Sequence, residues 1–193
     1  MVVANFSMTA EREQFVDFAG PYQLVPQAVL VLQDRTKPLE TIADLRAADV
    51  RVCAPTASTS AQALDEKDIP VELVDTNSDC MIGLGSGEYD AFSTDLPILA
   101  GFLSEDKERF EILELAIADH SELIGVAVPN GDWAMRDLIA YFLDRWQRGP
   151  EASPWLRAYD GTIGPLLGPE HRAQPLVQNL PVLADFDSRA PRA

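Results

Sequence analysis

Residues 50–66 read VRVCAPTASTSAQALDE, and the fold class can be inferred from the pattern of this segment. Residues 50–53 have the composition of a strand, whereas residues 58–65 have that of a helix. Small and hydroxylic residues lie between them. A strand, a short polar loop and a helix, in this order, form the basic repeating step of an α/β domain.

The same step recurs on both sides of this stretch. A continuous apolar run at 28–32 is typical of a strand buried on both faces. Thr41, followed three residues later by Asp44, indicates a capped helical turn at 41–45. Further along, the pattern predicts strands at 71–74, 90–93, 110–113 and 124–128, and helices at 78–84 and 96–103. This alternation predicts an α/β domain with a largely parallel sheet.

From Trp133 onward the apolar residues follow a helical period. Five of them fall on one helix face: Met135, Leu138, Ile139, Phe142 and Trp146. Gly149 and Pro150 are expected to end this helix, and another begins at 154–159. After Gly168 the sequence has no apolar period, so we expect residues 169–193 to form a tail.

Composition excludes several classes of function. The chain has 193 residues, 47% of them hydrophobic, which suits one large domain or two small ones. Its 15 basic and 31 acidic residues give a net charge of −16, which argues against nucleic acid and against a polybasic membrane anchor. The apolar runs are too short to span a bilayer. Two cysteines and two distant histidines, His120 and His171, give no metal-site spacing, so no metal or other cofactor is expected.

The first polar cluster with chemical potential runs from Asn5 to Arg12. It presents the Ser7 hydroxyl and a guanidinium, which can bind a carboxylate through two parallel hydrogen bonds. The alternative is a surface arginine paired with Glu11 or Glu13.

Two more clusters follow strands. Residues 57–62 leave backbone N–H groups and hydroxyls at a helix N-terminus, which suits an anion, although Ser58 or Thr59 as an ordinary cap explains them equally. Ser93, Thr94 and Asp95 lie at the carboxyl end of a strand, where open α/β sheets bind ligands. Asp95 can accept hydrogen bonds from an ammonium group, or it caps the helix beginning at Leu96. Together the clusters suggest a carboxylate clamp and an ammonium acceptor.

Four motifs together resemble the polar amino-acid solute-binding proteins of ABC importers, and especially their glutamate-binding branch. They are Ser7-x-Thr9-x-Glu11-Arg12, Val16-Asp17-Phe18-Ala19-x-Pro21-Tyr22, Ser58-Thr59-Ser60 and Asp90-Ala91-x-Ser93-Thr94-Asp95. The resemblance extends from about residue 3 to residue 168. It implies the type II periplasmic-binding-protein fold, in which two α/β lobes joined by two hinge strands close on a ligand.

The resemblance also implies which residues contact an amino-acid ligand: Asn5, Ser7, Arg12, Ala57, Ser58, Thr59 and Asp95. Arg12 matches the arginine that binds the α-carboxylate, with Ser7 beside it, and Asn5 falls where the backbone contacts the α-ammonium. The three loop residues 57–59 complete the carboxylate site from the second lobe. Asp95 matches the acid that holds the α-ammonium. The family often has glycine where Ala57 stands, and glycine or serine where Asn5 stands. No catalytic residue is expected.

The glutamate-binding branch carries a cysteine pair at the places of Cys53 and Cys80. The resemblance therefore implies a disulfide that closes a loop of about 28 residues and stabilises the fold by about 3 kcal/mol. The alternative is two buried thiols in a reducing compartment.

In the family the arginine motif follows a complete βαβα stretch and an export signal, whereas Arg12 is almost at the start here. We therefore expect an N-terminally truncated chain. The expected organisation is a remnant of lobe 1 at 1–21, a hinge at 22–26, lobe 2 at 27–123, a second hinge at 124–128, the C-terminal helices of lobe 1 at 129–168 and the tail at 169–193. An incomplete lobe 1 should expose apolar surface on Phe15, Phe18 or the Trp133 helix.

The resemblance implies an extracytoplasmic binding component of an ABC importer that captures glutamate or a related polar amino acid. Its partners would be the amino acid and the membrane permease, and membrane attachment would come only from a lipid anchor absent from this chain. Two alternatives are a ligand-sensing receptor ectodomain and an enzyme resembling cyclohexadienyl dehydratase. An enzyme would need a general acid or base, for which Glu11 and Asp95 are the candidates.

Overall fold

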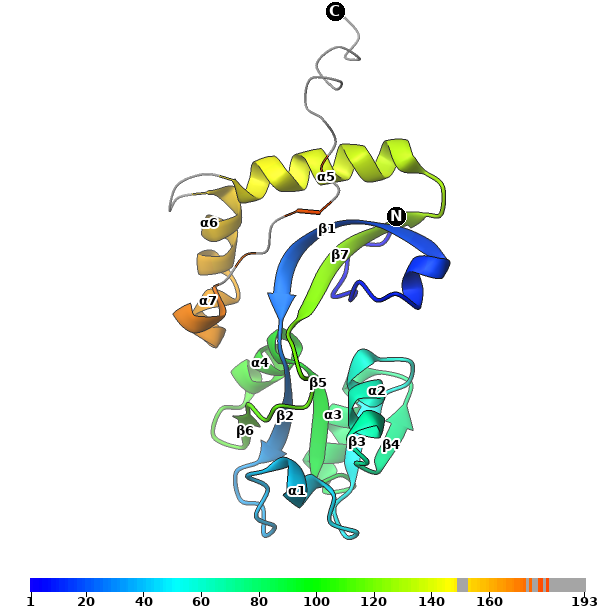
Figure 1. Cartoon of the computed structure of the whole chain (residues 1–193). Coiled ribbons are helices and arrows are strands. Elements are labelled where there is room, and N and C mark those ends of the chain that lie inside the picture. Colours follow the sequence, from blue (N-terminus) through cyan, green and yellow to red (C-terminus); the bar gives the residue numbers. More distant parts are fainter. Residues whose placement is uncertain (149–152, 173, 175–176, 179, 181–193) are drawn as a thin grey trace, which may run out of the picture. The chain divides into compact units, whose positions relative to one another are not determined.

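The computed structural model describes residues 1–148, 153–172, 174, 177–178 and 180 (Figure 1). The chain divides into two compact units. Unit 1 contains Met1–Leu24 and the part of the chain from Glu122 onward, and unit 2 contains Val25–Ser121. Every residue of unit 2 is described.

Unit 2 is built on a five-stranded sheet with the strand order β4-β3-β5-β2-β6. Its strands are β2 (Gln27–Leu32), β3 (Val52–Pro55), β4 (Val71–Val74), β5 (Ala91–Asp95) and β6 (Phe110–Leu113). β3 is parallel to β4 and β5, but β2 is antiparallel to both β5 and β6. Strands β3, β4, β5 and β6 therefore run in the same direction and β2 runs opposite to them, so the expectation of a largely parallel sheet is confirmed except at β2. The apolar run of β2 correctly indicated burial on both faces, but a strand of either orientation can have that pattern.

Helices cover both faces of this sheet. They are α1 (Ile42–Leu45), α2 (Thr59–Glu66), α3 (Asn77–Ser86) and α4 (Leu96–Glu105). Leu45 and Leu64, from the first two helices, join Val29 and Val31 of β2 in one buried cluster. On the other face, Phe102 of α4 meets Phe92 edge to face, with ring centroids 6.0 Å apart. A sheet between two helical layers forms a complete core.

Local capping explains where these helices begin. The predicted cap at Thr41 is confirmed, because its side chain and that of Asp44 form a reciprocal capping box. Thr76 and Asp79 form a second box at the start of α3. At the end of α3, Gly87 adopts a φ of 79°, the left-handed conformation that terminates many helices.

Unit 1 has a smaller sheet made of β1 (Val16–Val25) and β7 (Glu122–Pro129). The first residues of the chain add to it, since the Val2 N–H donates to Ala127 O at 2.8 Å and the Met8 N–H donates to Leu123 O at 2.8 Å. β1 was missed as a strand from sequence, because its polar residues and its Gly20–Pro21 step interrupt the apolar pattern. The segments expected as hinges, 22–26 and 124–128, lie in β1 with the residue after it and in β7.

The helical part of unit 1 follows β7. It contains the long helix α5 (Trp133–Gln147), α6 (Pro154–Gly161) and α7 (Gly164–Leu167) (Figure 1), and the short 3-10 helix η2 (Pro169–His171) follows α7. Another 3-10 helix, η1 (Arg12–Gln14), precedes β1. The carbonyl oxygen of Tyr22 accepts hydrogen bonds from Gln147 Nε2 at 3.0 Å and from Trp155 Nε1 at 2.7 Å. Polar side chains therefore dock α5 and α6 onto β1.

The apolar face predicted for α5 is largely exposed: Met135, Leu138 and Phe142 are exposed, and so is Trp133. Phe15 is exposed as well, so the expected apolar surface is confirmed at these two places. It is wrong for Phe18, which is 6% exposed because its ring packs on Phe6 with centroids 5.4 Å apart.

The residues expected to form a tail are only partly described. Pro169–His171 forms η2, and the Gln178 N–H donates to Gly20 O at 2.6 Å. The remainder of the expected tail, at 173, 175–176, 179 and 181–193, and the helix stop expected at Gly149 and Pro150 lie outside the described residues.

Candidate functional site

The buried polar side chains of unit 2 gather at one end of its sheet. They are Gln27, Ser60, Ser93, Thr94 and Asp95. Ser93 to Asp95 end β5, Ser60 lies in the first turn of α2, and Gln27 begins β2 directly opposite Asp95. Burying polar groups is costly unless they form hydrogen bonds, so their concentration at one place marks this end as the candidate site.

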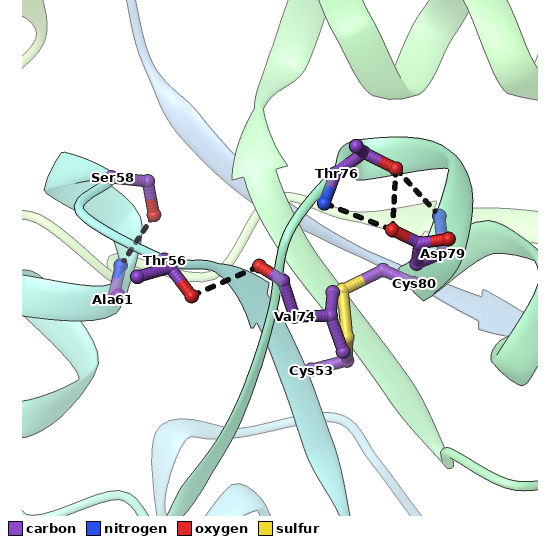
Figure 2. Close-up of a disulfide and its surroundings, with 8 residues drawn as sticks. All are labelled: Cys53, Thr56, Ser58, Ala61, Val74, Thr76, Asp79 and Cys80. Carbon is purple, nitrogen blue, oxygen red and sulfur yellow. Dashed lines mark hydrogen bonds between the residues drawn. A yellow bond between two sulfur atoms is a disulfide. The ribbon is translucent and has the colours of Figure 1, made fainter.

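The loop between β3 and α2 contributes one wall of this site. Ala57 adopts a φ of 58°, in the left-handed region where residues other than glycine are uncommon. The Ser58 side chain caps α2 by accepting a hydrogen bond from the Ala61 N–H at 3.0 Å (Figure 2). The Ser58 hydroxyl therefore has the ordinary capping role. Thr59 begins α2, and the backbone N–H groups of this first turn are the donors suited to an anion.

The same loop is tied to the neighbouring strand. The Thr56 hydroxyl donates to Val74 O at 3.1 Å (Figure 2), and the Thr56 backbone N–H donates to the same oxygen at 2.8 Å. Because β3 is hydrogen-bonded to β4 on one side and to β5 on the other, the loop after β3 lies beside both neighbouring strand ends. The two hydrogen bonds to Val74 O therefore fix the position of the loop backbone beside the end of β4.

The predicted disulfide is confirmed between Cys53 of β3 and Cys80 of α3 (Figure 2). The two Cα atoms are 5.7 Å apart, and both residues are fully buried. Cys53 precedes Thr56 by three residues, and Cys80 follows the capping residue Thr76 by four. The bond therefore links β3 to α3, close in sequence to the loops that follow β3 and β4.

Asp95 occupies the N-cap position of α4, but its side chain forms no capping hydrogen bond. The residue is 6% exposed. The helix start is held instead by the backbone, since the Leu96 N–H donates to Pro26 O at 2.9 Å. The alternative prediction, in which the Asp95 side chain caps α4, is therefore wrong.

On unit 1, the structure brings Arg12 and Ser7 into direct contact. Arg12 Nη1 donates to Ser7 O at 3.0 Å, and the guanidinium carbon lies 4.5 Å from the centroid of the Phe6 ring. The Arg12 N–H also donates to Thr9 Oγ1 at 3.2 Å, at the start of η1. These contacts orient the guanidinium, whose five N–H donors form the fork that matches a carboxylate.

Ser7 is buried and contacts β7 through both its side chain and its backbone. Its hydroxyl donates to a carboxylate oxygen of Glu122, while its backbone pairs with Ile124 of β7. Ser7 thus anchors the arginine through its carbonyl and anchors itself to β7. Asn5 is exposed at a bend two residues earlier.

Tyr22, in the second motif, is partly buried, and this burial raises the pKa of its phenol above the ordinary value. Its hydroxyl is therefore protonated at neutral pH, and it donates to Ala4 O at 2.8 Å. The bond connects β1 to the segment that carries Asn5 and Ser7.

Sequence reasoning missed three contributors: Phe6 beneath Arg12, Glu122 beside Ser7, and Gln27 opposite Asp95. Only Gln27 had a visible signal, because it is a polar residue directly before the apolar run at 28–32. Phe6 and Glu122 acquire their places through contacts that the local sequence does not encode.

The family model that describes bacterial extracellular solute-binding proteins, family 3, matches residues 1–159. The chain belongs to this family, and its fold class is the type II periplasmic-binding-protein fold. Within the part of the chain that the structure describes, no helix is long and apolar enough to cross a membrane. The same residues contain no cluster of three or more side chains able to hold a metal ion.

Among similar curated proteins, the glutamate-binding protein GluB of Corynebacterium efficiens is 31% identical over 150 residues, and that of Corynebacterium glutamicum is 32% identical. Each alignment covers 75% of this chain and 50% of the relative. The glutamine-binding protein GlnH of an ABC transporter from Bacillus subtilis is 31% identical over 69% of this chain and 48% of its own length. The chain thus spans about half the length of the curated relatives it matches.

Solved structures share the fold at lower identity. The solute receptor for L-cysteine of Neisseria gonorrhoeae has a TM-score of 0.72 and 24% identity, with 87% of this chain and 67% of the receptor covered. A substrate-binding protein of an amino acid ABC transporter has a TM-score of 0.70 and 23% identity, with 86% and 69% covered.

Proposed function

We propose that this chain captures a polar amino acid, with L-glutamate as the first candidate, as the binding component of an ABC importer. The single observation that carries the proposal is the position of two complementary groups on adjacent strands of unit 2. The N-terminus of α2 follows β3 and suits an anion, and the buried acid Asp95 ends the neighbouring β5. An amino acid offers one charge of each sign to such a pair.

Energetics support the same assignment of roles. A zwitterion leaves water only where both of its charges are paired, because an unpaired buried ion costs several kcal/mol. Arg12 is the proposed partner of the α-carboxylate, together with Ser7, Asn5 and the loop 57–59, and Asp95 is the proposed partner of the α-ammonium. Hydrogen bonds to charged groups contribute about 1.5–3 kcal/mol each, so either residue should control most of the affinity.

In this proposal, residues 27–123 form lobe 2, and residues 1–21 with 129–168 belong to lobe 1. The segments 22–26 and 124–128 act as hinges, and the closed state is favoured by ligand because only that state forms every contact. The protein acts outside the cytoplasm, delivers its ligand to a membrane permease and performs no chemistry on it. The family description and the relatives named as binding proteins support this placement.

The test is a thermal-shift screen against the twenty amino acids, followed by calorimetric titration of any that bind. We expect L-glutamate or a related polar amino acid to raise the Tm of the wild-type chain. Arg12→Ala and Asp95→Ala should each weaken binding by about tenfold to a hundredfold or more. Matched controls are Arg46→Ala, whose guanidinium donates to Lys67 O, and Asp106→Ala at the other end of α4. Both controls should bind like wild type.

Two results contradict the proposal. One is a folded chain whose Tm no amino acid changes. The other is turnover of prephenate or arogenate, which would favour an enzyme on this fold. One solved relative makes that second assay worthwhile: an ancestral amino acid-binding protein described as a precursor of cyclohexadienyl dehydratase has a TM-score of 0.62 and 25% identity.

A further inference from the structure

Gln27 is the one buried polar residue of unit 2 that begins an otherwise apolar strand. It is 5% exposed, and every other residue of β2 is apolar. Burying an amide is unfavourable unless it forms hydrogen bonds, and a leucine would extend the apolar run without that cost. A specific polar neighbour therefore best explains a glutamine at this position.

The register of the sheet identifies that neighbour as Asp95. Gln27 and Asp95 are direct partners in the antiparallel pair of β2 and β5, and the next pair on this face is Val29 with Ser93. Side chains of opposed residues project from the same face, with Cβ atoms about 5 Å apart. At that separation, the amide of a glutamine reaches the carboxylate of an aspartate.

Backbone contacts bracket the pair. Immediately before Gln27, Pro26 O accepts the Leu96 N–H at 2.9 Å. Immediately after it, Ala28 O accepts from the Ser93 hydroxyl at 3.3 Å. These bonds on both sides fix the spacing of the two strands, so the relative position of Gln27 and Asp95 is determined by the fold.

We propose that Gln27 is a positioning residue for Asp95: its side-chain NH₂ donates to the carboxylate and holds it in the orientation that receives the ligand ammonium. The ammonium part rests on the proposed function, whereas the hydrogen bond between the two side chains does not. Gln27 would act through Asp95 and need not touch the ligand.

The first experiment replaces Gln27 by methionine, which has a similar length and no amide. We expect Gln27→Met to raise the Kd for L-glutamate about tenfold, because Asp95 loses a hydrogen bond to its charged form. The matched control is Gln33→Met, directly after the other end of β2, where Nε2 donates to Lys107 O at 2.9 Å and Phe110 O at 3.1 Å. This control also loses an amide, and its Kd should change less than twofold.

A double-mutant cycle separates positioning from general damage. In the Asp95→Ala background there is no carboxylate to orient, so adding Gln27→Met should cause no further loss of affinity. A purely structural role of Gln27 would instead weaken binding by the same factor in both backgrounds.

A measurement without ligand keeps the proposal testable if Gln27→Met folds poorly or if the chain binds no amino acid. NMR of the wild-type chain should show a downfield Gln27 side-chain NH₂ signal that moves upfield in Asp95→Ala, while the Gln33 signal stays in place. An unchanged Gln27 signal in Asp95→Ala, or wild-type affinity in Gln27→Met, overturns the proposal. Failure of the wild-type chain to bind any amino acid overturns the proposed function, and the NMR result then decides the role of Gln27 alone.

Discussion

Unit 1 and unit 2 bury their apolar residues very differently. In unit 2, helices cover both faces of a five-stranded sheet, and residues such as Phe92 are fully buried. In unit 1, the sheet has two strands, and Phe15, Phe142 and Trp133 are 73%, 61% and 54% exposed. A helical period therefore predicts where an apolar face lies on a helix, but not whether anything covers it.

This contrast can be tested because each unit has its own spectroscopic probes. All three tryptophans, Trp133, Trp146 and Trp155, belong to unit 1, whereas the disulfide belongs to unit 2. Tryptophan emission thus follows the unfolding of unit 1. Hydrogen exchange of the amides of β2, β3 and β5 follows that of unit 2.

The largest effect is expected from truncating a phenylalanine in each unit. Phe92→Ala removes a ring packed against Phe102 and should lower the free energy of unfolding of unit 2 by about 4 kcal/mol. Phe142→Ala should change the stability of unit 1 by about 0.5 kcal/mol or less, because that ring is mostly in water. Denaturant unfolding by both probes measures the difference. Equal losses in the two variants would refute the contrast.

Removing the disulfide comes next. Cys53→Ala combined with Cys80→Ala should lower the stability of unit 2 by about 3 kcal/mol, because the cross-link no longer restricts the unfolded chain. Exchange in β3 and α3 should accelerate, with the tryptophan transition unchanged. Thiol titration of the wild-type chain in denaturant should find no thiol before reduction and two after it. A free thiol before reduction would contradict the bond.

Asp90, at the opposite end of the sheet from Asp95, gives a smaller and pH-dependent effect. Burial acts to raise its pKa, but hydrogen bonds from the Arg51 N–H and from Lys37 Nζ, with the charges of both residues, leave the pKa below its ordinary value. This carboxylate therefore contributes stability above the ordinary pKa of 3.8, and the contribution is lost as the pH falls through the lower pKa of the folded state.

Asp90→Asn should consequently cost unit 2 about 1 kcal/mol at neutral pH and flatten the stability curve below pH 3.8. Asp49→Asn is the control, because its exposed carboxylate lies 3.8 Å from the same lysine. Urea unfolding across the acid range provides the measurement. An unchanged acid limb in Asp90→Asn would show that the interactions of Asp90 with Arg51 and Lys37 contribute nothing to stability.

The smallest effect is a gain. Ala57→Gly relieves the left-handed conformation at the loop before α2 and should stabilise unit 2 by about 0.5 kcal/mol. Ala63→Gly, in the interior of α2, should instead cost about 1 kcal/mol. The difference between the two melting temperatures checks both. A loss in Ala57→Gly would mean that the strain at this loop is smaller than its φ suggests.

Much of the fold was predictable wherever the cause is local. The caps at Thr41 and Ser58 are hydrogen bonds to groups three residues away, so the local sequence is enough to predict them. The disulfide followed from a resemblance to a family rather than from spacing, and Cys53 does meet Cys80. The antiparallel orientation of β2 and the burial of Phe18 were not predictable, because both depend on partners distant in the sequence.

The candidate site also combines features with a local cause and features that depend on residues distant in the sequence. The motifs that contain Arg12, the loop 57–59 and Asp95 could be identified before the structure, because each of them is a short continuous segment. Only the tertiary structure placed Phe6 under Arg12, Glu122 beside Ser7 and Gln27 opposite Asp95. Helix caps are decided within one turn of chain, whereas strand register and side-chain neighbours are decided when distant segments pack together.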